Sequence, residues 1–219
     1  MTPDIETRLQ LAAERLQQLQ TEVDAYLADA SGRATGGMIP GTTLASIEVR
    51  PLDPPPTRLS ALVGEVLYHL RSALDFAVFM AALLDSGEEQ SDTQFPIVTD
   101  EDDWETQAKR RLKHLSRPRQ QVVLALQPFR GQRWTERLRD LSNPDKHRHL
   151  TVVAAEAEHK LTIKRTSEGF ETAFRPNVAL SFDDGADVVS SLQELLEKVR
   201  EAVARLLGPE GGVPSRRSA

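Results

Sequence analysis

The amino-acid sequence predicts an α+β fold that is mainly helical, with a central buried helix, a four- to five-stranded antiparallel sheet, and amphipathic helices at both ends. Three observations support this fold class. Apolar residues follow heptad spacing near both termini, residues 57–85 form a long apolar segment of helical periodicity, and short alternating segments occupy residues 150–182. Because helices and strands differ in their hydrophobic period, these patterns predict a sheet packed against helices.

Length and composition indicate one main domain. The chain has 219 residues, of which 39% are apolar and 27% charged, which is enough to bury a sizeable core. We expect a helical arm over residues 1–30, a single α+β domain over 44–207, and a disordered tail over 208–219, where three glycines and two prolines occur.

The composition also excludes several kinds of site and segment. The chain has no cysteine, which excludes disulfides and thiolate metal sites. Its first residues lack the apolar core of a secretory signal, and its longest apolar run, residues 76–84, is shorter than a bilayer span. We therefore expect a cytoplasmic protein with no membrane partner, and because glycine-rich phosphate loops and zinc-binding histidine pairs are missing, we expect no cofactor and no metal site.

The terminal helices carry heptad seams. Near the N-terminus, apolar residues alternate in steps of four and three, as in a coiled coil: they are Ile5, Leu9, Ala12, Leu16, Leu19, Val23 and Tyr26. The same alternation follows a predicted N-cap at Asp187 and comprises Val188, Leu192, Leu195, Val199, Ala202 and Leu206. The two seams can pair within one chain or form a homodimer contact, and the sequence leaves both possibilities open.

Between the seams, the elements are predicted from breakers and periodicity. Residues 44–50 alternate like a strand that the following prolines end, and the central helix begins at the N-cap Thr57 and ends near Asp85. Its main apolar stripe comprises Leu59, Leu62, Val63, Val66, Leu67, Leu70, Leu74, Ala77, Ala81 and Leu84. Shorter helices follow in residues 104–141. Four further strands are expected at residues 150–155, 160–165, 169–175 and 178–182.

Two motifs place charged side chains where packing alone does not require them. Arg71 and Asp75 are four residues apart on the apolar helix, where burial is costly unless the charges are paired. Asn143-Pro144 is typical of an N-cap followed by the first helical residue, and Asp145-Lys146-His147-Arg148 comes next. We expect the two motifs to form one polar centre, made of Tyr68, Arg71, Asp75, Asn143, Asp145, Lys146, His147 and Arg148. This centre either stabilises the fold or binds an anion, and its candidate catalytic residues are Arg71 and His147.

The distribution of charge suggests a class of partner. Residues 85–105 contain nine acids and no Lys or Arg, whereas residues 109–148 contain twelve Lys or Arg and three acids, a net charge of +9. This asymmetry is typical of proteins that bind RNA or another phosphate ligand, here through residues 109–148. The simpler interpretation is that the basic stretch docks on the acidic one, or that both are solvated helix faces.

The order of several motifs resembles a widespread bacterial family of uncharacterised proteins over residues 44–155. The motifs are Gly-Glu-Val-Leu at 64–67, Leu-Arg-Ser-Ala-Leu-Asp at 70–75, Thr-Gln-Phe-Pro-Ile at 93–97, Leu-Gln-Pro at 126–128, and the segment 143–148. At residues 68–76 that family usually reads His-Asn-Leu-Arg-Ser-Ala-Leu-Asp-His, where this chain has Tyr-His-Leu-Arg-Ser-Ala-Leu-Asp-Phe. The resemblance implies no established activity.

The arginine and histidine of the family form are similar to the signature of the HEPN superfamily, all-helical domains of which many cleave RNA with a dimer-paired Arg and His. This similarity implies a ribonuclease, or an inactive relative, in a defence or toxin system, with the histidine acting on the 2′-hydroxyl and the arginine stabilising the phosphorane. In this chain Phe76 replaces the histidine, so His147 would have to substitute. A third interpretation is a helical oligomerisation scaffold built on the terminal seams.

Overall fold

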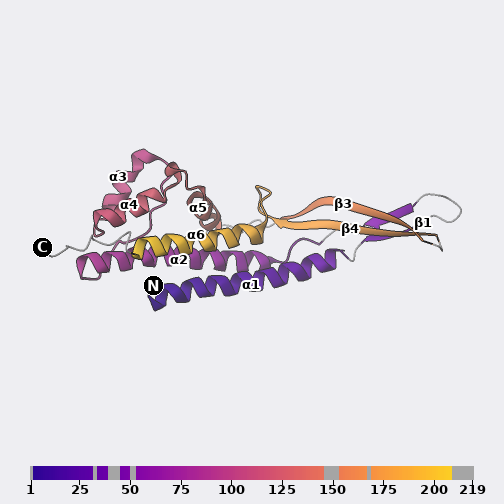
Figure 1. The fold of residues 1–219 in the computed structure, drawn as a ribbon, viewed down its shortest axis with the longest axis horizontal. Coiled ribbons are helices and arrows are strands. Elements are labelled where there is room, and N and C mark those ends of the chain that lie inside the picture. The colour runs from indigo at the N-terminus through magenta and orange to yellow at the C-terminus, as the bar shows by residue number, and fades with distance from the viewer. Residues whose placement is uncertain are drawn as a thin grey trace. The chain divides into compact units, whose positions relative to one another are not determined.

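The computed structural model describes residues 2–31, 34–38, 45–49, 53–145, 153–166 and 169–208, and it describes side chains for residues 2–28, 53–143 and 180–208. Figure 1 labels the main elements. In chain order the elements are α1 (Pro3–Ser31), β1 (Ala34–Met38), β2 (Ala45–Val49), α2 (Thr57–Ser86), the 3-10 helix η1 (Glu101–Asp103), α3 (Trp104–Arg111), α4 (Arg117–Ala125), the 3-10 helix η2 (Pro128–Arg130), α5 (Arg133–Asp145), β3 (Val153–Thr166), β4 (Gly169–Ser181) and α6 (Val188–Leu207).

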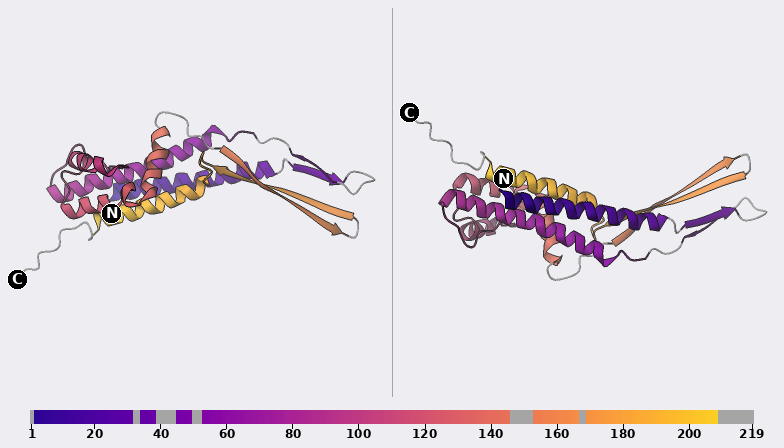
Figure 2. Two further views of the ribbon diagram at one scale, coloured as in Figure 1. Left: turned by 90° about the horizontal axis from the view of Figure 1, so that it is seen from above. Right: turned by 90° about the horizontal axis from the view of Figure 1, so that it is seen from below.

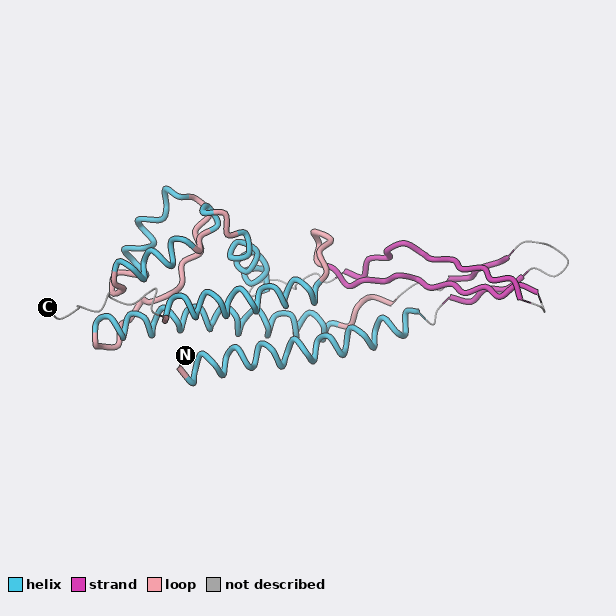
Figure 3. Tube along the Cα trace, viewed as in Figure 1, coloured by secondary structure: helices cyan, strands magenta, loops and turns pink. Residues whose placement is uncertain are grey.

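The chain divides into two compact units. Unit 1 contains Met1–Leu16, Val63–Leu150 and Leu192–Ala219, and unit 2 contains Gln17–Leu62 and Thr151–Ser191. In its described part, unit 1 contains helices and loops but no strand, whereas the four described strands all belong to unit 2. Figure 3 distinguishes helices, strands and loops by colour.

The core of unit 1 is built from the first half of α1, most of α2 and most of α6. Figures 1 and 2 show these three segments running side by side. The predicted seams supply the contacts, because Ile5, Leu9 and Ala12 on α1 are buried within the single chain, as are the seam residues of α6. Burying such an apolar stripe is what stabilises an amphipathic helix.

Helix α2 has nearly the bounds that its sequence predicts, and its apolar stripe is buried with one exception. Leu84 was expected in the main stripe but is 60% exposed. The small residues Ala73, Ala77, Ala81 and Ala82 are fully buried, which lets neighbouring backbones come close. Among the described residues, α2 is also the one helix long and apolar enough to cross a membrane by length and composition, a test that a buried core helix passes equally. The cytoplasmic location therefore stays a prediction.

Helix α5 differs from its prediction at its C-terminal end. The sequence pattern indicated a new helix start at Asn143, but α5 continues from Arg133 through Asn143 and Pro144 to Asp145. A proline lacks an amide hydrogen and breaks the interior of a helix, yet here it lies in the last turn, where it interrupts little of the hydrogen-bond ladder. The expected N-cap at Asp187 is confirmed, since the Asp187 carboxylate accepts a hydrogen bond from the Ser190 amide at 2.7 Å.

The predicted four- to five-stranded antiparallel sheet is wrong. The described strands of unit 2 form two separate two-stranded ladders, β1 with β2 and β3 with β4. The predicted strand at 44–50 pairs with β1, which was not among the predicted strands, and the described parts of the four later predicted strands merge into one long hairpin.

The merging has a local cause. The β3–β4 register runs from Val153 opposite Ser181 to Thr166 opposite Gly169, and it shifts between Ala157 and Lys160. There two residues of β3 lie opposite the single residue Pro176 of β4, which is the arrangement of a β-bulge. A bulge leaves its residue unpaired, so a proline between the predicted strands 169–175 and 178–182 is accommodated within a continuous hairpin.

Unit 2 also contains a short helical core. Leu19 and Val23 of α1 are buried, as are Leu59 and Leu62 of α2. Arg58 donates to Glu22 at 2.8 Å, and this hydrogen bond lowers the pKa of the Glu22 carboxyl. The seam ends at Tyr26, whose hydroxyl donates to the Asp53 carbonyl at 2.8 Å.

Candidate functional site

Arg71 and Asp75 bind the main chain of one residue. The Arg71 Nη2 atom donates to the Phe95 carbonyl oxygen at 2.5 Å, and the Phe95 amide donates to Asp75 Oδ1 at 3.0 Å. The two side chains also pair with each other at 3.3 Å. Together they satisfy both backbone groups of the fully buried Phe95, as the neighbouring strand of a sheet would.

The surroundings of this pair explain its electrostatics. The side chains of Arg71 and Asp75 are 16% and 31% exposed. Burial lowers the pKa of the Arg71 guanidinium, and the negative charge of Asp75 opposes this effect. A guanidinium remains charged in such a setting, so the paired carboxylate and the Phe95 carbonyl provide the compensation that a buried cation requires.

Gln127 holds the same segment one and three residues beyond Phe95. Its side-chain oxygen accepts from the Val98 amide at 2.9 Å, and its side-chain nitrogen donates to the carbonyls of Pro96 and Val123 at 3.0 and 2.9 Å. Gln127 is fully buried, and an unpaired amide there would be costly. Residues 95–98 are thus fixed by side chains on both sides, and we call this arrangement the main-chain clamp: Arg71, Asp75 and Gln127 around Phe95, Pro96 and Val98.

The clamp unites three of the motifs noted in the sequence, those at 70–75, 93–97 and 126–128. Each supplies one part: the charged pair, the extended segment, and the buried amide. The motifs therefore have a structural role in unit 1.

A polar pocket of about 350 Å³ lies beside the clamp. It is bounded by Arg71 of α2, by the clamped segment, and by one side each of α3 and α5. The residues that line it are Arg71, Gln94, Phe95, Pro96, Ile97, Val98, Thr99, Asp103, Gln107, Arg111, Arg139, Ser142 and Asn143. All belong to unit 1.

Helices α3 and α5 position the polar lining by their spacing. Asp103, Gln107 and Arg111 are four residues apart, so they form one row along α3 and its preceding turn. Arg139 comes from α5, donates to Thr99 Oγ1 at 3.2 Å, and pairs with Asp140 at 2.7 Å. Three arginines and one carboxylate therefore line this pocket.

The structure places the predicted centre only in part. Arg71 and Asn143 line the pocket, and Asp75 supports its wall. Tyr68 does not line the pocket and is 64% exposed. Asp145 is the last residue of α5 and its side chain lies outside the described residues, as do Lys146, His147 and Arg148 entirely. Whether the two motifs meet stays a prediction.

Sequence reasoning missed Asp103, Gln107, Arg111 and Arg139 as members of one site. A signal was present for α3, because its polar residues repeat every four positions on one side. Of the acids that precede α3, Asp100 caps the 3-10 helix η1 by accepting from the Asp102 amide at 3.0 Å. No group of three or more acids or histidines able to hold a metal occurs in the searched, described part of the chain.

Among the residues that the structure describes, three ion pairs join the acidic and basic stretches. Lys109 pairs with Glu105 at 3.0 Å, Arg130 with Glu101 at 2.6 Å, and Arg119 with Asp85. Some charges of the two stretches therefore neutralise each other within the chain, which agrees with the interpretation that the basic stretch docks on the acidic one.

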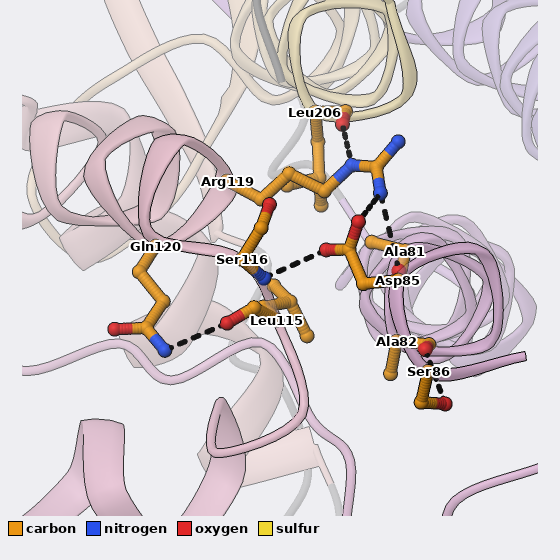
Figure 4. A network of polar contacts seen from close by, with 9 residues as sticks. All are labelled: Ala81, Ala82, Asp85, Ser86, Leu115, Ser116, Arg119, Gln120 and Leu206. Atoms are coloured by element: carbon orange, nitrogen blue, oxygen red, sulfur yellow. Dashed lines mark hydrogen bonds and ion pairs between the residues drawn. The ribbon is translucent and has the colours of Figure 1, made fainter. Parts of the chain in front are cut away.

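The Arg119–Asp85 pair is buried and forms a second polar network, shown in Figure 4. Arg119 also donates to the carbonyl oxygens of Leu206 and Ala81 at 3.2 and 3.4 Å. The second Asp85 oxygen accepts from the Ser116 amide at 2.7 Å. The network joins the ends of α2, α4 and α6, and the signal for it was an arginine on the same face of α4 as the buried Val122 and Val123.

No family model, curated protein or solved structure matches this chain. The ribonuclease interpretation requires an imidazole beside Arg71, and neither His69 nor His114 lines the pocket. Phe76 occupies the position at which the family noted in the sequence analysis has a histidine. The guanidinium of Arg8 lies over its ring, 4.6 Å from the ring centre, in a cation–π contact. The HEPN-like interpretation and the oligomerisation scaffold both stay predictions.

Proposed function

We propose that this chain binds a small oxyanion of the phosphate or phosphate-monoester class in the pocket beside the main-chain clamp. The volume of about 350 Å³ suits a small ligand rather than a macromolecular surface, since ligand pockets commonly span about 300–1,000 Å³. Guanidinium groups bind phosphate and carboxylate oxygens with paired hydrogen bonds, which makes arginine the usual residue for such ligands.

The observation that carries the proposal is the environment of the Arg111 guanidinium. Its side chain is half-buried in the pocket lining, and no hydrogen bond or ion pair joins it to any residue that the structure describes. Arg71 and Arg139 line the same pocket, and their carboxylate partners, Asp75 and Asp140, do not. Because like charges repel more strongly where water is partly excluded, a bound anion would stabilise this arrangement.

The main-chain clamp supports the same proposal. Residues 95–98 form one wall of the pocket, and their backbone is held by Arg71, Asp75 and Gln127. A wall fixed in advance lowers the ordering cost of binding, so a small anion needs fewer contacts to be retained.

The test is calorimetric titration of the full chain with inorganic phosphate and pyrophosphate at low ionic strength, comparing Arg111→Gln with Arg110→Gln. Arg110 is the exposed neighbour on α3 and does not line the pocket, so it controls for a change of net charge. We expect Arg111→Gln to weaken binding about tenfold or more, the effect of losing a hydrogen bond to a charged group, and Arg110→Gln to leave it nearly unchanged. Absence of binding, or an equal loss in both variants, contradicts the proposal.

A further inference from the structure

We infer that the ligand is dipolar: it carries a phosphate-type group for the arginines and, at its other end, an amino or ammonium group that Asp103 accepts. This inference rests on the proposed function and names the ligand class of the same pocket.

The row along α3 has opposite charges at its two ends. Asp103 begins it, Gln107 lies one turn further, and Arg111 ends it. At a rise of 1.5 Å per residue, eight residues separate the Asp103 and Arg111 backbones by about 12 Å. All three residues line the pocket, and the amide of Gln107 provides both a donor and an acceptor between the charged ends.

Asp103 has no structural task that accounts for its position. It precedes the first residue of α3, but its side chain makes no capping hydrogen bond. Its neighbours are engaged, since Asp100 caps the Asp102 amide and Glu101 pairs with Arg130. The Asp103 carboxylate is exposed, lines the pocket, and has no hydrogen bond or ion pair to the described part of the chain.

The same acids argue against a polyanion as the ligand. Asp103, which lines the pocket, is the last of four consecutive acids that begin at Asp100, and a nucleic-acid strand passing them would be repelled. A small molecule with a single phosphate avoids this repulsion, and one that also carries a cation gains from it.

The test compares two series of ligands that differ only in the amino group: 2-aminoethyl, 3-aminopropyl and 5-aminopentyl phosphate, and the corresponding alkyl phosphates. Titrations use the full chain, the Asp103→Asn variant, and Asp102→Asn as a matched control that does not line the pocket. For an exposed carboxylate, we expect at least one amino compound to bind about two- to fivefold more tightly than its alkyl counterpart, with the preference weakening as salt rises. Asp103→Asn should abolish the preference for the amino compound, and Asp102→Asn should retain it.

The outcomes separate the two proposals. Equal binding of both series overturns the dipolar ligand and leaves the oxyanion site standing. A preference that survives Asp103→Asn also overturns the assignment to Asp103. If neither series nor inorganic phosphate binds, both proposals fail.

Discussion

Arg71 and Asp75 lie one helical turn apart on α2 and hold the carbonyl oxygen and the amide nitrogen of the same residue, Phe95. The pair therefore acts on a segment twenty residues downstream through main-chain atoms. The i,i+4 ion pair therefore connects two distant segments of the chain, and its contribution to the free energy of unfolding can be measured.

Replacing Arg71 with Met should reduce the free energy of unfolding by about 1–3 kcal/mol, because it leaves the buried Phe95 carbonyl and the Asp75 carboxylate without their donor. Urea denaturation followed by circular dichroism measures this. Lys109→Gln is the control, since the Lys109–Glu105 pair is 79% exposed on both sides and should contribute little. Equal stability of the Arg71 variant and the wild type would contradict the structural role of the clamp.

Gln127→Met retains the size of the side chain but removes its amide. We expect a loss of about 2–4 kcal/mol, because Val98 and Pro96 lose buried hydrogen-bond partners. Native-state hydrogen exchange gives a local measurement: the Val98 amide should be protected in the wild type and exchange faster in the variant. The Gln120 side chain donates to the carbonyls of Leu112 and Leu115 and does not contact the clamped segment through a hydrogen bond, so Gln120→Met should leave Val98 protected.

The buried Arg119–Asp85 pair offers a double-mutant test. Arg119→Met alone should reduce the free energy of unfolding by about 3–5 kcal/mol, because it leaves the Asp85 carboxylate unpaired with arginine in a buried site. Adding Asp85→Leu should recover a large part of that loss, since no unpaired charge remains, although the Ser116 amide then lacks its acceptor. Additive losses in chemical denaturation would show that the two side chains do not interact.

His69 should make the protein less stable in mild acid. Burial lowers the pKa of its imidazole below the ordinary 6.5; Glu65 raises it, and Arg15 and Arg8 lower it further. As the pH falls below 6.5, His69 takes up a proton in the unfolded chain before it does so in the folded chain. The free energy of unfolding therefore decreases between pH 6.5 and the lower pKa of the folded state. Above pH 6.5 the imidazole is neutral in both states, and this loss of stability is absent. Denaturation at pH 7.5 and 5.5 should show a smaller decrease for His69→Gln than for wild type; an identical decrease would exclude His69 as the cause.

The helices were more predictable than the sheet. Apolar periodicity predicted the extent of α2 and the buried seams of α1 and α6. A helix that buries one face repeats its apolar residues every three or four positions, as Ile5, Leu9 and Ala12 do. Strand periodicity shows that a strand exists but not how many neighbours it has. Only the register of β3 with β4 reveals the bulge that accommodates Pro176 between the predicted strands 169–175 and 178–182.

The candidate site was half predictable for a similar reason. Arg71 and Asp75 stand out as charges on an apolar helix, so they could be identified, but their partner could not. A backbone carbonyl and amide have no side-chain signature, and the expectation that a charged cluster at 143–148 would satisfy Arg71 left Phe95 out. Arg111 and Arg139 belong to ordinary-looking basic helices, and only their convergence on one pocket distinguishes them.

The hydrogen bonds of the clamp to Phe95, Pro96 and Val98 all end on main-chain atoms, and Ile97 and Thr99 of the same stretch also line the pocket. These bonds do not depend on which side chains residues 97 and 99 carry. Substitution at these two positions can therefore change the lining of the cavity while the bonds that fix its wall remain, so the surface of the pocket is free to vary separately from folding.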